Sequence, residues 1–337
     1  MSNKHLPHDL AQLQSLPLEA KIIMTQQRIR QWYEYWDGMV YVSFSGGKDS
    51  TVLKHIVDSM YDDVPALFVN TGLEYPEIQK FAMSQKNVVT VRPKMRFDQV
   101  IKKYGYPVIS KSVSHAVKIA KRNPNGKVIK NLFDPENKGR FGCYKWKFLI
   151  DSDIPTSEEC CNVMKKAPAK EYTKATGRKP IIGTLADESS LRYSKWLKQG
   201  CNAFETRNPT SQPLSFWTEQ DILHYIKKYN VPYCSVYGEI VVETEDDNQI
   251  NLIDYLGCYE ESDKLKTTGC DRTGCIFCMF GCHLEKEPNR FQRLKQTHPR
   301  QYEYCIGGGE KVNGKWQPSK EGLGLGMVLD FIGVKYE

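Results

Sequence analysis

The stretch Val40-Tyr-Val-Ser-Phe-Ser-Gly-Gly-Lys-Asp-Ser50 decides the fold. Its first five residues predict a short buried strand, and a helix is expected to follow the Gly-rich turn, at about residues 50–60. Gly46 and Gly47 allow a tight turn in which backbone N–H groups point into one concavity. The N-terminal end of the following helix adds positive potential. The segment therefore predicts an anion site at the carboxyl end of a strand.

Side chains of the same turn supply the other groups that a phosphate needs. Lys48 is a mobile cation, and Ser45 and Ser50 carry hydroxyl donors. The spacing G-x-x-x-x-G-K-S/T of a Walker A loop is absent, so a different kind of phosphate loop is expected. The alternative is an ordinary glycine turn that is capped by Asp49 and binds nothing.

The segments on both sides of this turn alternate between helix and strand. Leu18–Tyr35 carries its apolar residues close to one face and predicts an amphipathic helix. Residues 66–70 and Val88–Val91 predict further buried strands, and Pro76 begins a helix between them. Strands that alternate with helices pair in parallel through right-handed crossovers. The sequence therefore predicts an α/β fold with a doubly wound parallel sheet.

Later segments extend this plan and then depart from it. Residues 180–183 predict a strand, and residues 217–229 predict an amphipathic helix with Thr218 as its N-cap. Residues 240–256 predict a hairpin or an insertion. We expect an N-terminal helical segment at residues 1–37, a nucleotide-binding domain at 38–235 and a Cys-rich appendage, packed on the core, at 236–337.

The composition of the chain limits the classes of protein to which it can belong. No run approaches the roughly 18 apolar residues of a membrane span, and the N-terminus has no apolar signal core, so a soluble cytoplasmic protein without membrane contact is expected. The net charge of +7 is modest, but residues 94–130 hold ten Lys or Arg and only one acid, Asp98. Such a basic stretch can bind the phosphates of a nucleotide, bind a nucleic acid, or form a solvated surface that binds nothing. Candidate partners are a nucleic acid, a sulfur-donor protein and a second copy of the chain.

The turn at Ser45 to Ser50 resembles the phosphate-binding signature of the adenine nucleotide α-hydrolase-like superfamily, also called N-type ATP pyrophosphatases. Members typically bind ATP and attack its α-phosphate, releasing pyrophosphate, and others bind adenylylated sulfate. The segment Phe68-Val-Asn-Thr-Gly-Leu-Glu-Tyr-Pro-Glu77 is similar to the D-T-G-x-x-F/Y-P-E segment of phosphoadenosine phosphosulfate (PAPS) reductases, with Asn70 in place of the usual Asp.

Three further elements carry the same resemblance. Residues 160–168 look like the C-C-x-x-x-K-x-x-P element of the iron–sulfur branch, and residues 213–218 match the P-I/L-x-x-W-T/S step from strand to helix. Residues 183–192 are similar to G-x-R-x-x-E-S-x-x-R, with Leu185 in place of the Arg that contributes one expected phosphate contact. The chain thus resembles the PAPS reductase-like family over about residues 38–230. The resemblance implies that Lys48 and Asp49 are catalytic and that the nucleotide is bound by Ser43, Phe44, Ser45, Gly46, Gly47, Lys48, Asp49, Ser50, Asn70, Thr71, Gly72, Gly183, Glu188, Ser189 and Arg192.

Eleven cysteines, an odd number, indicate metal or redox chemistry more than a disulfide framework. Cys275 and Cys278 form a C-x-x-C in a turn with glycine, flanked by Cys270 and Cys282. The family pattern implies a 4Fe-4S cluster held by Cys160, Cys161, Cys275 and Cys278.

Other ligand sets remain open. The local set Cys270, Cys275, Cys278 and Cys282 resembles the cluster region of DNA-phosphorothioation sulfurtransferases. Zinc is a further alternative, although tetrahedral zinc rarely accepts two adjacent cysteines. The remaining cysteines are expected to be small buried side chains: Cys143, Cys201, Cys234, Cys258 and Cys305.

Three functions remain open. In the first, the protein uses ATP and Mg²⁺ to adenylylate an acceptor and helps to transfer sulfur to it. In the second, it reduces adenosine phosphosulfate (APS) or PAPS to sulfite with a thioredoxin-type donor. Reductases carry a catalytic Cys in an E-C-G-L-H motif that this sequence does not contain, and the intact Lys48 and Asp49 favour ATP. The third is a non-catalytic regulator associated with nucleic acid, suggested by the basic residues 94–130.

Overall fold

A computed structural model describes residues 4–137, 139, 142–243 and 262–337. Contacts within the chain divide it into two compact units. The first unit comprises Met1–Asn70, Glu74–Val91 and Ala169–Thr273, and the second comprises Thr71–Leu73, Arg92–Pro168 and Gly274–Glu337. The boundaries expected at residues 37 and 235 stay predictions.

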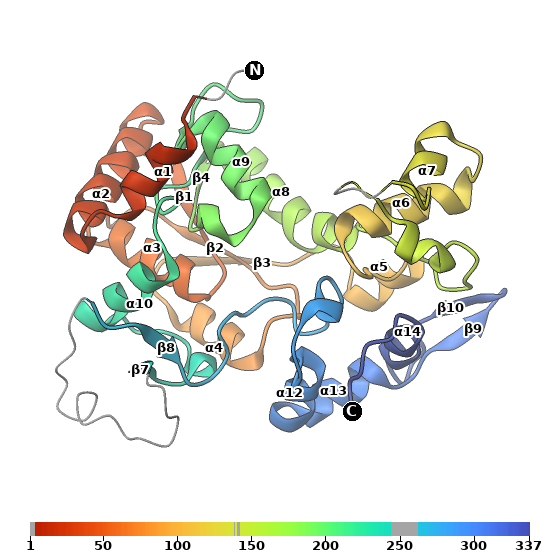
Figure 1. The fold of residues 1–337 in the computed structure, drawn as a ribbon. Helices are drawn as coiled ribbons and strands as arrows, with labels where there is room; N and C mark the ends of the chain where they lie inside the picture. Colours follow the sequence, from red (N-terminus) through yellow and green to blue (C-terminus); the bar gives the residue numbers. More distant parts are fainter. Residues whose placement is uncertain (1–3, 138, 140–141, 244–261) are drawn as a thin grey trace. The chain divides into compact units, whose positions relative to one another are not determined.

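The first unit is built on a six-stranded sheet with the order β3-β2-β1-β4-β6-β5 (Figure 1). All neighbouring pairs are parallel except β5 and β6, so the sheet is mixed and mostly parallel. β1 lies inside the sheet, where Val42 pairs with Ala66 of β2 and with Ile181 of β4. The strands are β1 (Val40–Phe44), β2 (Ala66–Val69), β3 (Val88–Val91), β4 (Lys179–Ile182), β5 (Asn202–Ala203) and β6 (Thr210–Ser211).

The α/β fold is therefore confirmed, with one correction at the sheet edge. A wholly parallel sheet was expected, but β5 runs antiparallel to β6. Only residues 204–209 join these two strands, and a parallel pair would need a crossover of a dozen or more residues. The short connection thus requires the antiparallel direction.

Helices surround this sheet, and two of them are tied together by buried polar contacts. Thr218 is the N-cap of α10 as predicted, and its hydroxyl accepts a hydrogen bond from the Asp221 N–H. The Asp221 carboxylate also pairs with Lys21 of α2 at 2.7 Å, in a place where Lys21 is only 3% exposed. The helices of this unit are α1 (Pro7–Gln14), α2 (Leu18–Tyr35), α3 (Lys48–Asp58), α4 (Pro76–Ser84), α8 (Ala167–Thr176, from Ala169 onward), α9 (Ser190–Gln199) and α10 (Glu219–Lys228).

An antiparallel pair of strands, β7 (Ile240–Val242) and β8 (Leu265–Thr267), completes the first unit. β7 lies in the segment 240–256 that was predicted to form a hairpin or an insertion, but its partner β8 lies beyond that segment, and the predicted continuation after residue 243 lies outside the described residues. The central strand β1 and helix α3 form the core, with Val42, Val52, Leu53 and Val57 fully buried. Each such side chain contributes about 1.5–3 kcal/mol through burial.

The second unit brings together two chain segments that are distant in sequence. The Tyr106 hydroxyl donates to the Leu323 carbonyl at 2.8 Å, and Gly281 N–H donates to the Ile109 carbonyl at 2.9 Å. No helix among the described residues has both the length and the apolar character of a membrane span. The elements of the second unit are α5 (Phe97–Tyr104), α6 (Lys111–Arg122), α7 (Lys127–Leu132), η1 (Tyr144–Leu149), η2 (Asn162–Lys166), η5 (Cys282–Leu284), α12 (Arg290–Thr297), α13 (Pro299–Ile306), β9 (Glu310–Val312), β10 (Lys315–Gln317) and α14 (Leu325–Phe331).

Candidate nucleotide site and cysteine cavity

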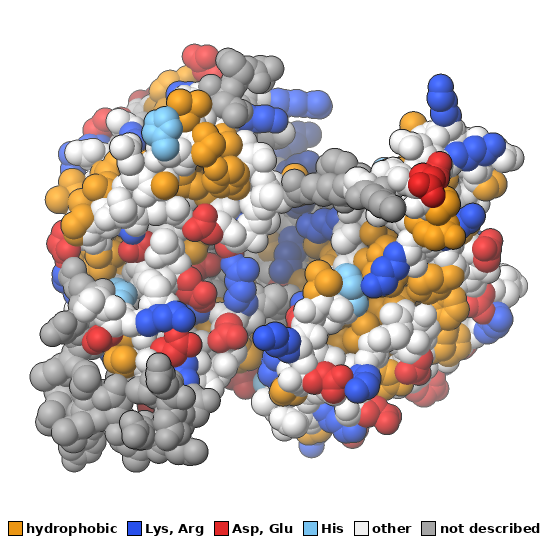
Figure 2. Space-filling view, in the orientation of Figure 1, with side chains coloured by type: hydrophobic (Ala, Val, Ile, Leu, Met, Phe, Trp, Pro, Cys, Tyr) orange, Lys and Arg blue, Asp and Glu red, His pale blue; other side chains and the backbone are white. Residues whose placement is uncertain are grey.

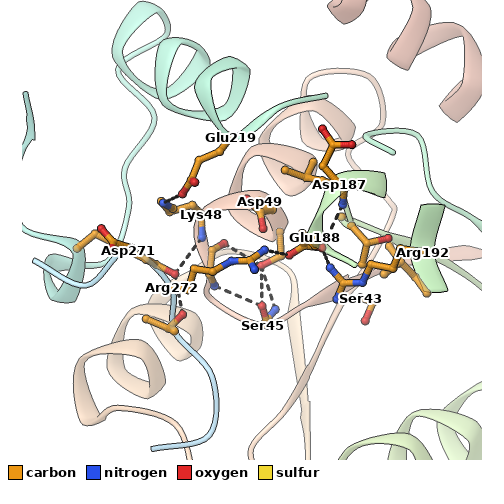
Figure 3. Close-up of a pocket in the computed structure, with 18 residues that line it drawn as sticks. Ser43, Ser45, Lys48, Asp49, Asp187, Glu188, Arg192, Glu219, Asp271 and Arg272 are labelled. Carbon is orange, nitrogen blue, oxygen red and sulfur yellow. Dashed lines mark hydrogen bonds and ion pairs between the residues drawn. The ribbon is translucent and has the colours of Figure 1, made fainter. Parts of the chain in front are cut away.

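A cavity of about 450 Å³ lies in the first unit at the carboxyl ends of β1 and β4 (Figure 3). These two strands are adjacent, and the chain leaves them toward opposite edges of the sheet, which is the switch point where α/β folds bind ligands. The cavity is lined by Ser43, Ser45, Gly47, Lys48, Asp49, Ser50, Ile182, Gly183, Thr184, Leu185, Asp187, Glu188, Arg192, Glu219, Tyr237, Asp271, Arg272 and Thr273.

The phosphate loop at its base is closed by its own hydrogen bonds. The hydroxyls of Ser45 and Ser50 share a hydrogen bond of 3.0 Å, and the Ser50 hydroxyl donates to the Gly47 carbonyl at 2.9 Å. Gly47 is the N-cap of α3 and offers no side chain to cap the first N–H groups of the helix. The Lys48 N–H donates to the Tyr237 hydroxyl at 3.3 Å, and the other N–H groups of the first turn suit an anion.

Two glycines keep the base of the cavity open. A Cβ atom on Gly47 would lie 3.3 Å from both the Ser45 and the Tyr237 hydroxyl oxygens. A Cβ atom on Gly183 would lie 2.9 Å from the Asp49 carbonyl oxygen, which is closer than such atoms approach. The chain that follows β4 can therefore approach the start of α3 only because Gly183 lacks a side chain, whereas a side chain at Gly47 would crowd the Ser45 and Tyr237 hydroxyls.

Lys48 and Asp49 form one charged end of the cavity. Lys48 Nζ lies 2.7 Å from Glu219 Oε1 and 5.3 Å from the centre of the Tyr237 ring, and its side chain is 5% exposed. Burial raises the pKa of Asp49, while Lys48 and Arg272 act in the opposite direction. This end thus holds a buried cation between carboxylates.

Two arginines and one carboxylate form the other charged end (Figure 3). Glu188 of η3 (Ala186–Glu188) pairs with both Arg192 and Arg272. Burial lowers the pKa of Arg192, and the neighbouring Arg272 charge lowers it further. Two guanidinium groups therefore share a single carboxylate, which leaves positive charge for a phosphate.

A second cavity lies wholly within the second unit and is lined by four cysteines. The cysteines are Cys160, Cys161, Cys275 and Cys278. The other residues that line the cavity are Leu73, Phe97, Pro107, Met164 and Lys165. Among the described residues, no three His, Cys, Asp or Glu side chains converge on one metal-ion position. A 4Fe-4S cluster does not need that convergence, because each of its four thiolates binds a different iron. Four thiols, two of them adjacent in sequence, are a donor set that a 4Fe-4S cluster can bind.

Cys160 and Cys161 have unlike thiols. Their Sγ atoms lie 3.9 Å apart. The hydrogen bond from Cys160, with the charges of Lys111, Lys165 and Lys166 nearby, lowers the pKa of Cys161 to about 6. The same contact, together with burial, raises the pKa of Cys160. Cys161 is the N-cap of η2, a π-helical turn of the kind often found at functional sites.

The other cysteines lie outside this cavity. Cys282 is 1% exposed, and its Sγ donates to the Met279 carbonyl at 3.0 Å. Cys270 belongs to the first unit. The predicted burial of Cys143, Cys201, Cys234 and Cys305 is confirmed, and Cys258 lies outside the described residues.

The phosphoadenosine phosphosulfate reductase domain matches residues 39–279. The chain belongs to this family. An uncharacterised protein of Methanocaldococcus jannaschii is 23% identical over 280 residues, which are 80% of this chain and 48% of that protein. The chain therefore spans about half the length of that relative.

Reductases are among the more distant relatives of this reductase-domain protein. Adenosine 5'-phosphosulfate reductase of Geobacillus kaustophilus is 26% identical over 203 residues, 59% of this chain and 67% of that enzyme. PAPS reductase of Candida auris, solved with phosphate, aligns at 14% identity with a TM-score of 0.37, covering 70% of this chain and 92% of that chain. Candida glabrata FMN adenylyltransferase, solved with ATP, aligns at 12% identity with a TM-score of 0.38, covering 74% and 78%.

Most of the residues expected to bind the nucleotide line the first cavity. Those that do not are placed elsewhere: Phe44 is 3% exposed in the core, Ser189 is the N-cap of α9, and Thr71 and Gly72 belong to the second unit. Gly46 and Asn70 also lie outside the lining. The residues brought together in the cavity are Ser43, Ser45, Gly47, Lys48, Asp49, Ser50, Gly183, Glu188 and Arg192.

Sequence reasoning missed several polar residues of this cavity. Glu219 directly follows the predicted N-cap Thr218, a position that could have marked it. Tyr237 and Arg272 carry no local signal, because they reach the cavity through the tertiary arrangement of η4 (Ser235–Tyr237) and the loop after β8. Asp271 and Thr273 were missed for the same reason, whereas Ile182, Thr184, Leu185 and Asp187 lie within or beside the recognised segment 183–192 and could have been named from it.

Proposed function

We propose that this protein binds ATP in the first cavity and transfers the adenylyl group to an acceptor, releasing pyrophosphate, in a reaction coupled to sulfur transfer. One observation carries the proposal: the intact Ser-Gly-Gly-Lys-Asp-Ser loop faces a cavity lined by five carboxylates and three cations. A bare phosphate ester would be repelled by the excess of carboxylates. A nucleotide that arrives with a divalent cation balances that charge.

The chain's own groups divide the work as follows. Lys48 and the N–H groups at the start of α3 bind phosphate oxygens, and the Ser45 and Ser50 hydroxyls join them once they turn from the hydrogen bonds that they make with each other and with the Gly47 carbonyl. The acceptor's nucleophile forms a bond to the α-phosphorus, and the bond to the bridging oxygen breaks, so pyrophosphate leaves with the electron pair. Asp49 would hold Mg²⁺, which would offset negative charge on the leaving pyrophosphate.

The cysteine cavity supports the second part of the proposal. Cys160, Cys161, Cys275 and Cys278 would hold a 4Fe-4S cluster, which when bound supplies a negatively charged centre for sulfur chemistry. The nearby lysines stabilise thiolate at Cys161. Burial raises the pKa of the half-buried Cys278 thiol, and the charge of Arg290 opposes that shift.

The competing functions find less support. Cys305, the one cysteine near the C-terminal end of this sequence, is fully buried, and burial raises its pKa well above the ordinary range, so it is a poor nucleophile for a sulfite-forming reductase. The basic stretch 94–130 uses part of its charge internally, since Lys118 pairs with Glu158 and Lys121 donates to backbone carbonyls. On the face shown in Figure 2, basic and acidic side chains are interspersed rather than gathered in one basic patch.

One experiment separates these functions. The protein is purified without oxygen, assayed for iron and sulfide, and incubated separately with ATP, APS and PAPS. Release of pyrophosphate from ATP supports our proposal. Release of sulfite from APS or PAPS would overturn it in favour of a reductase, and no turnover of any of the three would favour a non-catalytic role.

A further inference from the structure

We propose that Arg272, which lies between Cys270 and Cys275 and is not among the residues expected from the sequence to bind the nucleotide, is a phosphate-binding residue that makes the first cavity selective for nucleotides with more than one phosphate. The inference rests on the proposed nucleotide site. Arg272 lines the cavity together with Lys48 and Arg192, and its side chain is 59% exposed. It is thus a cation that an incoming ligand can reach.

The loop that carries Arg272 is held on both sides. Gly269 N–H donates to the Tyr237 carbonyl at 2.9 Å, and Cys270 N–H donates to the Val236 carbonyl at 3.0 Å. On the other side, the hydroxyls of Thr273 and Tyr237 share a hydrogen bond of 2.6 Å. The Tyr237 hydroxyl also accepts from the Lys48 N–H at 3.3 Å, so the loop is tied to the phosphate loop itself. Arg272 is therefore positioned by the groups that would bind the nucleotide.

The charge around Glu188 leaves Arg272 available. Glu188 is 13% exposed and pairs with Arg192 as well as with Arg272, so one carboxylate faces two guanidinium groups. An ion pair with a partner as exposed as Arg272 contributes little to stability. A phosphate can replace Glu188 at Arg272 at small cost and forms bidentate hydrogen bonds there.

Position 185 explains why such a residue is needed. The family motif places an arginine there, but Leu185 is 4% exposed with its side chain in the apolar core. Leu185 lines the cavity without a charge, and its N–H donates to Glu188 at 3.3 Å. The guanidinium of Arg272 reaches the same Glu188 carboxylate from another part of the chain. We infer that Arg272 supplies the charge that position 185 lacks.

The test compares ATP and AMP binding to Arg272→Gln by calorimetry in the presence of Mg²⁺. We expect ATP affinity to fall about tenfold, as for loss of one charge-assisted contact, and AMP affinity to change much less. Arg272→Lys should retain part of the difference. The matched control is Arg207→Gln, which removes an exposed arginine of the same unit that does not line the cavity. Equal losses for ATP and AMP would mean that Arg272 either binds the phosphate that both nucleotides share or only positions its loop, and would overturn the selectivity that we infer.

A second variant tests the compensation directly. Adding Leu185→Arg to Arg272→Gln should restore ATP affinity if the two positions serve one phosphate, and a folded double variant without restoration contradicts that part. Lys48→Ala separates the inference from the proposed function. If Lys48→Ala weakens ATP binding while Arg272→Gln does not, the role of Arg272 is wrong and the nucleotide site stands. If neither weakens it, both are wrong.

Discussion

Lys48 Nζ and Glu219 Oε1 lie 2.7 Å apart, so the cation of the phosphate loop is already paired with the first turn of α10. The pair is asymmetric, because Lys48 is 5% exposed and Glu219 is 52% exposed. The exposed Glu219 carboxylate can turn toward solvent when a phosphate binds, whereas the buried Lys48 side chain stays in the cavity. The pair therefore holds Lys48 in position before the nucleotide binds.

We predict that Lys48→Ala weakens ATP binding by roughly tenfold or more, because a charge-assisted contact to phosphate contributes about 1.5–3 kcal/mol. Titration calorimetry with ATP and Mg²⁺ measures the effect. Lys80→Ala is a suitable control, since Lys80 is an exposed lysine of α4 outside the cavity. Equal ATP affinities for Lys48→Ala and the control would show that the phosphate loop does not bind the nucleotide through Lys48.

We predict that ATP is cleaved between its α- and β-phosphates. The reason is that the intact loop resembles that of pyrophosphate-releasing members of the superfamily, with Asp49 beside Lys48 at the start of α3. Phosphorus NMR should show AMP or an adenylylated product together with pyrophosphate. ADP and orthophosphate would instead indicate attack on the γ-phosphate and would refute the prediction.

The sequence predicts the parts of this molecule that local patterns determine. The bounds of α2, β1, α4 and β3 follow from the periodicity of apolar residues and from the turn-forming residues at their ends. The Thr218 cap follows from its position directly before an amphipathic helix. The two-residue strand β5 is too short to leave a pattern.

The candidate site divides in the same way. The residues on the Ser45 to Ser50 turn form a continuous motif and could be named from the sequence. Tyr237 and Arg272 enter the cavity because backbone hydrogen bonds join η4 to the loop after β8, which is a long-range pairing. No single-sequence pattern reports such a pairing.

We predict that His55 makes the protein less stable as pH falls. Burial lowers its pKa below the ordinary 6.5, with Asp58 opposing and Lys54 adding to the effect, and its Nδ1 lies 2.9 Å from the Tyr225 hydroxyl. Below pH 6.5 the unfolded chain takes up a proton that the folded chain resists, so the free energy of unfolding decreases as pH falls through that value.

Urea unfolding at several pH values between about 7.5 and 5.5 tests this prediction. His55→Gln removes the titrating group, so its stability should fall less steeply with pH than that of the unchanged protein. A residual slope is expected, since burial also lowers the pKa of His5 and His283. Parallel slopes for the two proteins would show that His55 does not contribute.

We predict that Cys161→Ser loses an oxygen-sensitive 4Fe-4S cluster and that Cys282→Ser keeps it. Cys161 lines the cavity with Cys160, Cys275 and Cys278, whereas Cys282 is buried outside the lining and donates to a backbone carbonyl. Both variants are reconstituted without oxygen and compared by brown absorbance and by iron and sulfide content. Cys305→Ser is the matched control for loss of a fully buried thiol away from the cavity.

The comparison decides between the two ligand sets. If Cys282→Ser loses the absorbance while Cys161→Ser and Cys305→Ser keep it, the local set with Cys270 and Cys282 is correct and our choice is wrong. If both Cys161→Ser and Cys282→Ser keep it, neither set is complete, and Cys143 or Cys258 becomes the next candidate. Cys143 is a further thiol of the second unit, and Cys258 lies outside the described residues. Tightly bound zinc without sulfide in the unchanged protein would instead argue against a cluster.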